Sequence, residues 1–410
     1  MPDPPDPPDL PDLPDLPDLP GPRAQPGFSR RELLAAVLLS PAARRQAPPS
    51  GARLVGVVPL GTPGAQSPPF GRLLGDGLDA RLFTDLSQIT ASDHSPIVPN
   101  DTFFVRTAAA PKLPAADRWT IHIGGLVRTP VDASLRDLEP HAAAPARLLL
   151  ECSGNADPLN YGLLSAADWQ GIPFQTLLDR VQPAAAAGAH RVLVSGIDDD
   201  SRAWRTSIAG ASWIFTRDDL ARAILAVRMN GAPLPRDHGF PARLIVPGWY
   251  GCACIKWVDR IDLVADDSPA TSQMREFAAR THQPFDSRAM ENPLRARDFI
   301  PATIDTAAMP VRVEKWIAGG RPEYRIVGIV WGGSKPTSAL SIRFRSGGPW
   351  TRVDNCPLPQ STDTWSVWTH TWRPTEPGRY EIVLRVDDPS IRTRRLDIFF
   401  YVREIAIDEV

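Results

Sequence analysis

The stretch Ala146-Arg147-Leu148-Leu149-Leu150-Glu151-Cys152-Ser153-Gly154-Asn155 joins an apolar run to a turn sequence. Residues 146–150 predict a buried strand, and residues 153–155 predict a turn that lets the backbone approach a bound group closely. Cys152 would therefore lie at a strand end, where a thiolate can serve as a soft metal ligand or a nucleophile. A nucleophilic cysteine needs a general base, and the sequence does not show which residue would serve Cys152 in this way. The simpler alternative is an inert, buried cysteine.

A second cluster of chemically useful residues lies further along the chain. His238 and Arg243 are five residues apart, with glycine and proline between them, so they occupy an irregular entry to a strand. An imidazole and a guanidinium there could bind a heterocycle with several acceptors and its phosphate, and Lys256 would add a second charge for the phosphate. The alternative is an ordinary surface pair. Cys252 and Cys254 alternate on one strand face and could hold another metal, but no additional ligand pair is visible, so simple packing is the favoured explanation.

The length and the charge of the chain limit the classes of protein to which it could belong. At about 150 residues per domain, 410 residues predict two or three packed units. The 45 Lys and Arg residues nearly balance the 47 Asp and Glu residues, and a net charge of −2 excludes a global basic field for nucleic acid. No run of 18 apolar residues occurs, so no transmembrane helix is expected. Four cysteines are too few for a disulfide scaffold.

From about residue 101 the chain mixes short strands with helices, which predicts an α+β fold. The expected strands are 102–106, 119–123, 146–150, 191–195, 244–246 and 255–264, and the expected helices are 172–181 and 218–229. Residues 48–100 are rich in proline and glycine and are expected to wrap the surface. Residues 266–308 have little pattern, which suits a connector.

After Met309 the pattern indicates strands only. Leu340, Ile342 and Phe344 alternate with polar neighbours, and about a hundred residues of this kind predict a β-sandwich of immunoglobulin type. Such a second domain is expected to pair two chains into a homodimer. Four tryptophans are expected in its core or at an interface, namely Trp350, Trp365, Trp368 and Trp372.

The amino-terminal leader differs from the rest of the chain. Residues 1–26 carry 11 prolines and predict a disordered tail. Arg30 and Arg31 then precede a short apolar stretch and small residues, which resembles a twin-arginine export signal. The expected location is therefore the periplasm, with the cytoplasm as the alternative. A surface helix capped by Ser29 would explain the same residues without export.

Three separated motifs together resemble the sulfite oxidase family of molybdopterin enzymes. They are Glu151-Cys152-Ser153-Gly154-Asn155, Trp169-Gln170-Gly171-Ile172-Pro173, and the series Met229-Asn230-Gly231, 236–241, Arg243, 246–248, Gly251 and 255–257. The resemblance implies a molybdopterin-binding domain over 101–270 and a dimerisation domain over 309–410. The leader (1–47), the irregular surface segment (48–100) and the connector (271–308) complete the expected organisation.

The resemblance also implies roles for individual residues. Cys152 matches the single thiolate ligand of molybdenum, whose other ligands come from the pterin dithiolene and from oxygen. Arg106 matches an arginine close to the metal and pterin. The residues that match pterin or phosphate contacts are Asp198, His238, Arg243, Cys254, Ile255 and Lys256.

Other positions depart from the family pattern. Members that oxidise sulfite have an arginine where this chain has Asp157, and a tyrosine beside the metal that is missing from residues 201–219, where Trp204 stands. A carboxylate near the metal would repel a sulfite-like dianion, and tryptophan in place of tyrosine favours an apolar substrate. Asp157 and Trp204, with Arg106, are therefore the candidates for shaping the substrate pocket.

The sequence thus favours a periplasmic molybdopterin oxidoreductase that transfers an oxygen atom to or from a small sulfur or organic compound. Electrons would pass to a separate carrier such as a c-type cytochrome, because the chain has no haem attachment motif. The alternative is an exported binding or assembly protein with a degenerate, inactive cofactor site. Molybdenum analysis separates the two hypotheses.

Overall fold

The described part of the chain is built mainly from strands. The computed structural model describes residues 51–61, 80–107, 115–183, 188, 190–197, 211–281, 295–398 and 400–410. Residues 46–410 form one unit, to which every element below belongs. The expected leader 1–47, with its arginine pair, lies outside the described residues. In the described ranges no helix is long and apolar enough to cross a membrane.

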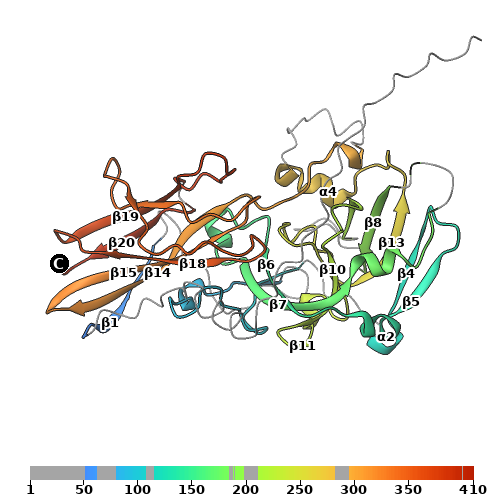
Figure 1. Cartoon of the computed structure of the whole chain (residues 1–410), viewed down its shortest axis with the longest axis horizontal. Coiled ribbons are helices and arrows are strands. Elements are labelled where there is room, and N and C mark those ends of the chain that lie inside the picture. Colours follow the sequence, from blue (N-terminus) through green and yellow to red (C-terminus); the bar gives the residue numbers. More distant parts are fainter. Residues whose placement is uncertain are drawn as a thin grey trace, which may run out of the picture. The chain divides into compact units, whose positions relative to one another are not determined.

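The first sheet contains the strand that leads to Cys152 (Figure 1). Its order is β11–β10–β7–β6, and β12 also pairs with β10. All its pairings are antiparallel. Its strands are β6 (Ala146–Glu151), β7 (Leu164–Pro173), β10 (Ile224–Met229), β11 (Ala232–Pro233) and β12 (Arg243–Ile245).

A second five-stranded sheet has the order β5–β4–β13–β8–β9. β4 and β13 run parallel and the other pairs run antiparallel. Alternate residues of β4 and β8, such as Ile121 and Val194, are fully buried, as the period-2 pattern predicts. The strands are β4 (Thr120–Gly125), β5 (Val131–Ser134), β8 (Arg191–Gly196), β9 (Ser212–Thr216) and β13 (Val258–Val264).

The C-terminal residues, joined by β1 from residues 53–58, form two four-stranded antiparallel sheets, ordered β1–β14–β15–β18 and β17–β16–β19–β20. Figure 1 shows β14, β15 and β18 next to one another. Trp365 and Trp368 are buried, as expected, whereas Trp372 is partly exposed and stacks on Phe344 at 4.1 Å between ring centres. The strands are β1 (Arg53–Val58), β14 (Ala307–Ala318), β15 (Arg321–Trp331), β16 (Leu340–Arg343), β17 (Thr351–Arg352), β18 (Ser366–Trp372), β19 (Gly378–Val386) and β20 (Arg403–Ile407).

Helices in the described ranges are short. The expected α+β class is therefore wrong in the amount of helix, because strands form most of the regular structure. The α-helices are α2 (Leu135–Leu138), α3 (Phe174–Leu178) and α4 (Ser272–Glu276). The 3₁₀ turns are η1 (Leu86–Gln88), η2 (Ala116–Arg118), η3 (Glu139–His141), η4 (Pro158–Asn160), η6 (Arg236–His238), η7 (Ala278–Thr281) and η9 (Ala296–Asp298).

The helix expected over 218–229 is wrong, and the helix expected over 172–181 is mostly wrong. Residues 224–229 form β10, which is bordered by β7 on one side and by β11 and β12 on the other. A central buried strand is apolar without alternation, so its sequence matches a buried helix equally well. In the segment 172–181, β7 continues to Pro173, and only the five residues of α3 are helical.

Two segments expected to lack regular structure contain elements. Residues 53–58, within the expected surface segment, form β1 and pair with β14. In the expected connector, Thr271 caps α4, and its hydroxyl accepts a hydrogen bond from the N–H of Met274 at 3.2 Å. Both elements are short, and neither has the periodicity that sequence reading depends on.

Candidate functional site

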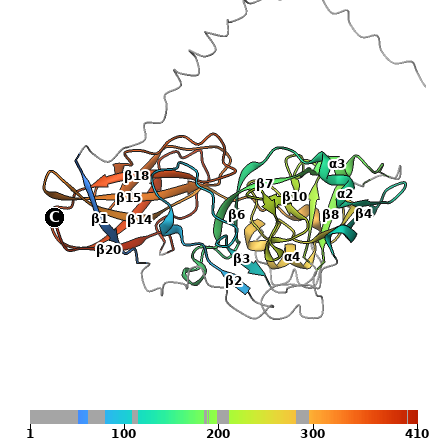
Figure 2. The same ribbon diagram turned by 90° about the horizontal axis from the view of Figure 1, so that it is seen from below.

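A pair of short antiparallel strands places two arginines side by side at one pocket. β2 (Ala80–Leu82) pairs with β3 (Val105–Thr107), as Figure 2 shows. In the register of this pair, Arg81 lies directly opposite Arg106. Residues opposite each other in an antiparallel pair point to the same face of the sheet. Both arginines line a pocket of about 260 Å³. Arg81 also donates from Nη1 to Oδ1 of Asn160 at 3.3 Å, a residue of the same pocket wall.

Cys152 is half-buried and lines this pocket from the end of β6. Its N–H donates to the carbonyl of Leu163 at 3.0 Å, and its carbonyl accepts the N–H of Asn155 at 2.9 Å. Burial raises the pKa of the Cys152 thiol, while the N–H of Gly154 and the charge of Arg106 oppose that rise. The thiol is therefore mainly protonated at neutral pH, and a bound cation is needed to favour the thiolate.

Arg243 brings a buried positive charge to the pocket wall. Its residue is 5 % exposed, and its Nη1 donates to the carbonyl of His238 at 3.2 Å. The Nε of Arg243 is buried and has no hydrogen-bond partner within the described residues. Burial lowers the pKa of Arg243 to about 10, so the guanidinium remains charged at neutral pH. A buried cation with an unused donor is suited to hold an anionic ligand.

His238 is buried behind Arg243 and is not among the residues that line the pocket, contrary to its expected direct contact with the cofactor. Its ring meets Phe103 edge-on at 5.3 Å, and Nε2 lies 3.2 Å from the carbonyl oxygen of Asn100. Burial, with the charges of Lys256 and Arg243, lowers the pKa of His238 to about 3. The imidazole is therefore neutral, and we infer that Nε2 carries the proton donated to Asn100.

The buried imidazole predicts a loss of stability in acid. Below pH 6.5 the unfolded chain binds a proton at His238, whereas the folded chain does not until about pH 3. Stability should thus fall as the pH falls through this window, by up to about 1.4 kcal/mol per pH unit. Urea unfolding at several pH values between 7 and 4 measures this slope. A His238→Gln variant should have a shallower slope, and equal slopes would contradict the prediction.

The segment 251–257 forms the opposite wall of the pocket. The N–H of Gly251 donates to the carbonyl of Glu151 at 2.8 Å, which joins this segment to the strand end at Cys152. Cys252, Cys254, Ile255 and Lys256 all line the pocket, as expected for the last three. The Nζ of Lys256 donates to the carbonyl of Asp237 at 2.6 Å. The Sγ of Cys254 lies 3.5 Å from the N–H of Val246.

Helix α4 completes the pocket, and the sequence did not predict this. Gln273, Glu276 and Phe277 all line it. Gln273 donates from Nε2 to the carbonyl of Cys252 at 2.5 Å, which ties the helix to the opposite wall. The capping threonine before this helix was the available signal. Among the described lining residues Glu276 is the acidic one, against four cations: Arg81, Arg106, Arg243 and Lys256.

Besides His238, three expected site residues are not placed in the pocket. Asp157 is exposed and does not line the pocket. Its Oδ1 accepts a hydrogen bond from the N–H of Leu159 at 2.9 Å, so the carboxylate stabilises the local turn. This placement gives no support to the expected repulsion of a dianion by Asp157. Asp198 and Trp204 lie outside the described residues.

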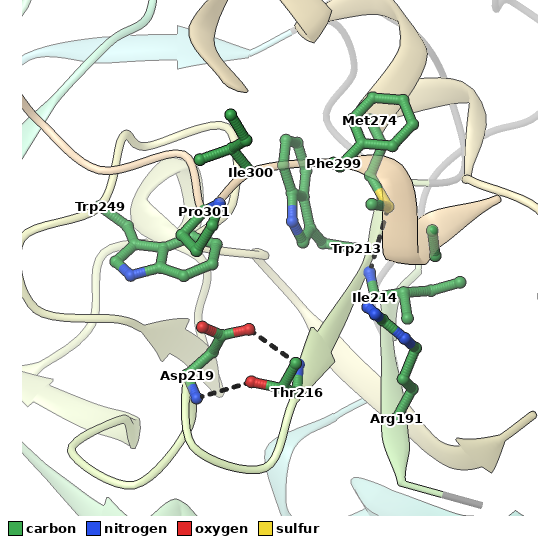
Figure 3. A pocket seen from close by; sticks show the side chains of 11 residues that line it. Arg191, Trp213, Ile214, Thr216, Asp219, Trp249, Met274, Phe299, Ile300 and Pro301 are labelled. Carbon is green, nitrogen blue, oxygen red and sulfur yellow. Dashed lines mark hydrogen bonds between the residues drawn. The ribbon is translucent and has the colours of Figure 1, made fainter. Parts of the chain in front are cut away.

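A second, smaller pocket of about 80 Å³ lies on the other side of α4. Figure 3 shows Trp213 beside Met274 and Phe299, with Arg191 near the rim. Met274 Sδ accepts the N–H of Ile214 at 3.5 Å. Because α4 turns Met274 to this pocket and Gln273 to the larger one, the apolar contacts here fix the helix that closes the larger pocket.

The larger pocket has the chemistry that a molybdopterin cofactor requires. It presents the soft thiol of Cys152, together with the unused donor of Arg243 and the ammonium of Lys256. No group of three or more His, Cys, Asp or Glu residues in the described ranges is placed to hold a metal ion. A metal bound here would thus need most of its ligands from an organic cofactor, and a separate metal at Cys252 and Cys254 finds no support.

Comparison with known proteins agrees with this chemistry. Residues 108–272 match the family model of the oxidoreductase molybdopterin binding domain. Human mitochondrial sulfite oxidase is 28 % identical over 256 residues, covering 56 % of this chain and 46 % of that protein. The NAD(P)H nitrate reductase of Hordeum vulgare is 26 % identical over 70 % of this chain and 33 % of its own length.

A solved structure extends the likeness to most of the fold. The sulfane dehydrogenase SoxCD from Paracoccus pantotrophus matches with a TM-score of 0.59 and 18 % identity, covering 82 % of this chain and 89 % of that one. The chain spans about half the length of the human sulfite oxidase that it matches. The matched domain, the relatives and the pocket together imply a molybdenum-molybdopterin cofactor. Over its molybdopterin-binding domain the chain is similar to the sulfite oxidase family of molybdopterin-dependent oxidoreductases.

Proposed function

We propose that this chain catalyses oxygen-atom transfer to or from a small sulfur compound at a molybdenum held by Cys152. One observation carries the proposal: the Cys152 thiol and four cationic side chains line the same pocket. When bound, the cofactor supplies the two-electron redox chemistry, and the protein supplies binding, orientation and electrostatics. We further propose that electrons leave singly to an external carrier such as a c-type cytochrome.

The residues of the pocket divide the work of binding. Arg243 and Lys256 are proposed to hold the phosphate of the cofactor, because both bring donors to the pocket wall and Arg243 has one to spare. Cys152 is proposed to anchor the metal. Arg81 and Arg106 remain to orient the substrate, and a negatively charged sulfur compound suits their paired guanidinium groups.

The proposal is tested by purifying the full chain from a host that makes molybdopterin. Metal and pterin analysis should give about one molybdenum and one pterin per chain. Sulfite, thiosulfate, sulfoxides and N-oxides are then tested as substrates, with a dye as electron acceptor or donor as each requires. Absence of molybdenum would favour a binding or assembly protein with an inactive site. Turnover of N-oxides alone would contradict a sulfur substrate.

Arg81 provides a prediction about substrate charge. Arg81→Gln should raise the KM for an anionic substrate about tenfold, because a hydrogen bond to a charged group contributes about 1.5–3 kcal/mol. The kcat should change less, since the cofactor contacts remain. Steady-state kinetics with sulfite and with a neutral sulfoxide measure the difference. Asp157→Asn is the control and should leave both KM values unchanged, because its carboxylate serves only its own turn.

The C-terminal sheets and the amino-terminal leader have proposed roles of their own. We propose that the two C-terminal sheets form an immunoglobulin-like sandwich over 309–410 that pairs two chains into a homodimer. The antiparallel pairing within both sheets supports this assignment, with seven of their eight strands in the C-terminal part of the chain and the eighth, β1, at residues 53–58. The arginine pair at residues 30 and 31 supports export to the periplasm by the twin-arginine route. Size measurement in solution and fractionation of expressing cells test these two points.

A further inference from the structure

A completely buried carboxylate lies next to Cys152. Glu151 is the last residue of β6 and is 0 % exposed. Its Oε1 accepts hydrogen bonds from Arg394 Nη1 at 2.7 Å and from Asn155 Nδ2 at 3.0 Å. Its Oε2 accepts from Arg394 Nη2 at 2.6 Å and from Trp331 Nε1 at 2.9 Å. The carboxylate is thus held by four donors.

Two of the residues that supply these donors come from the C-terminal part of the chain. Trp331 ends β15, and Arg394 lies 243 residues after Glu151. Arg394 is itself fixed: its backbone N–H donates to Thr306 at 2.9 Å, and its Nη1 also donates to the hydroxyl of Tyr401 at 2.9 Å. Its guanidinium also packs over the Trp331 ring, 5.7 Å from the ring centre. A bidentate pair of this kind has one geometry and so fixes both partners.

The position of Glu151 links this pair to the pocket. Successive side chains of a strand point to opposite faces, so a carboxylate fixed on one side orients the thiol that follows it. Asn155 bonds to Glu151 through its side chain and to Cys152 through its backbone, which closes the turn on itself. The N–H of Gly251 holds the Glu151 carbonyl from the opposite pocket wall.

We propose that Glu151 and Arg394 form a positioning pair through which the C-terminal part of the chain orients the Cys152 thiol in the cofactor pocket. The inference rests on the proposed role of Cys152 as metal anchor. It gives the C-terminal strands a function in the site itself, separate from any role in dimerisation. Arg394 does not line the pocket, so it acts only through Glu151.

The chain offers a matched control pair away from the pocket. Glu314 is also buried, and its Oε2 accepts from Arg325 Nε at 3.0 Å and from Arg325 Nη2 at 2.8 Å. A tryptophan, Trp316, donates to the same carboxylate at 3.1 Å. Neither Glu314 nor Arg325 lines the pocket. Loss of either pair should weaken the fold, whereas only loss of Arg394 should disturb Cys152.

The test compares Arg394→Gln with Arg325→Gln in the full chain. In cofactor-free protein, the rate at which iodoacetamide alkylates Cys152, followed by mass spectrometry, should rise at least threefold in Arg394→Gln and stay at the wild-type rate in Arg325→Gln. In the loaded enzyme, the electron paramagnetic resonance signal of molybdenum should shift in Arg394→Gln only. Arg394→Lys, which keeps the charge, should restore part of both readouts.

The outcomes separate the inference from the proposed function. Wild-type alkylation and an unchanged resonance signal in folded Arg394→Gln would overturn the positioning role, while loss of the signal in Cys152→Ser would still support the metal anchor. An unchanged signal in Cys152→Ser would instead overturn the anchor. If Arg394→Gln does not fold, Trp331→Phe removes one donor and keeps the ion pair. Its alkylation rate should then at least double, and no change would overturn the inference.

Discussion

Cys152→Ser is expected to lower turnover at least about 100-fold while the chain keeps its fold. Loss of a residue that merely orients a metal ligand costs about 10–100-fold, so loss of the ligand itself should cost more. A serine hydroxyl is a hard donor that stays protonated at neutral pH, whereas molybdenum in this proposal is held by a soft thiolate. The serine differs from cysteine by one atom, so the turn at 152–155 should be retained. Activity and circular dichroism of the purified variant measure the two effects.

The matched control for this variant is Cys252→Ser. Cys252 lines the same pocket, and burial likewise raises the pKa of its thiol, so the two variants differ in position more than in chemistry. Cys252→Ser should keep at least about half of the wild-type activity, because no role on the metal is proposed for it. Equal losses in the two variants would contradict a single cysteinyl anchor, as would full activity in Cys152→Ser.

Much of the strand pattern could be predicted from sequence because burial on one face leaves a period of two. β4, β6, β8, β16 and β19 fall close to their expected positions. β10 could not be distinguished from a helix, because it is apolar except for Arg228 and lies between neighbouring strands on both sides. β1 could not be predicted because its partner, β14, lies about 250 residues away. Local sequence carries no information on such a pairing.

The candidate site likewise combines residues that a local motif could predict with residues that only contacts between distant parts of the chain bring there. Cys152 and Lys256 were predictable because each stands in a local motif that imposes a turn or strand end. Arg81 was not predictable, since it becomes part of the site only by lying opposite Arg106 in the antiparallel pair of β2 and β3. Asp157 follows Cys152 closely in sequence, yet its side chain is exposed and does not line the pocket, because proximity in sequence does not fix the direction of a side chain. Arg394 joins the site through a contact with Glu151 that spans 243 residues.

The second large effect is expected from Arg243→Met, which should reduce cofactor content at least about tenfold without destabilising the cofactor-free protein. The guanidinium is buried, and its Nε has no partner in the described part of the chain. An isolated buried charge is costly, and replacing buried charge by an apolar side chain of similar size is often neutral or stabilising. A bound phosphate would gain about 1.5–3 kcal/mol from this donor, which corresponds to roughly 10–100-fold in affinity.

Analysis of pterin and molybdenum measures the expected loss of cofactor. Urea unfolding of protein made without cofactor measures the expected lack of destabilisation. Arg191→Met is the control, because Arg191 lies beside the smaller pocket shown in Figure 3 and should leave cofactor content unchanged. A large loss of stability in cofactor-free Arg243→Met would mean that the arginine serves the fold. Retention of cofactor in that variant would mean that the phosphate lies elsewhere. The combination of lost cofactor with unchanged or higher stability is expected only if Arg243 is kept buried for a ligand, because the fold itself leaves the Nε of Arg243 without a hydrogen-bond partner in the described residues.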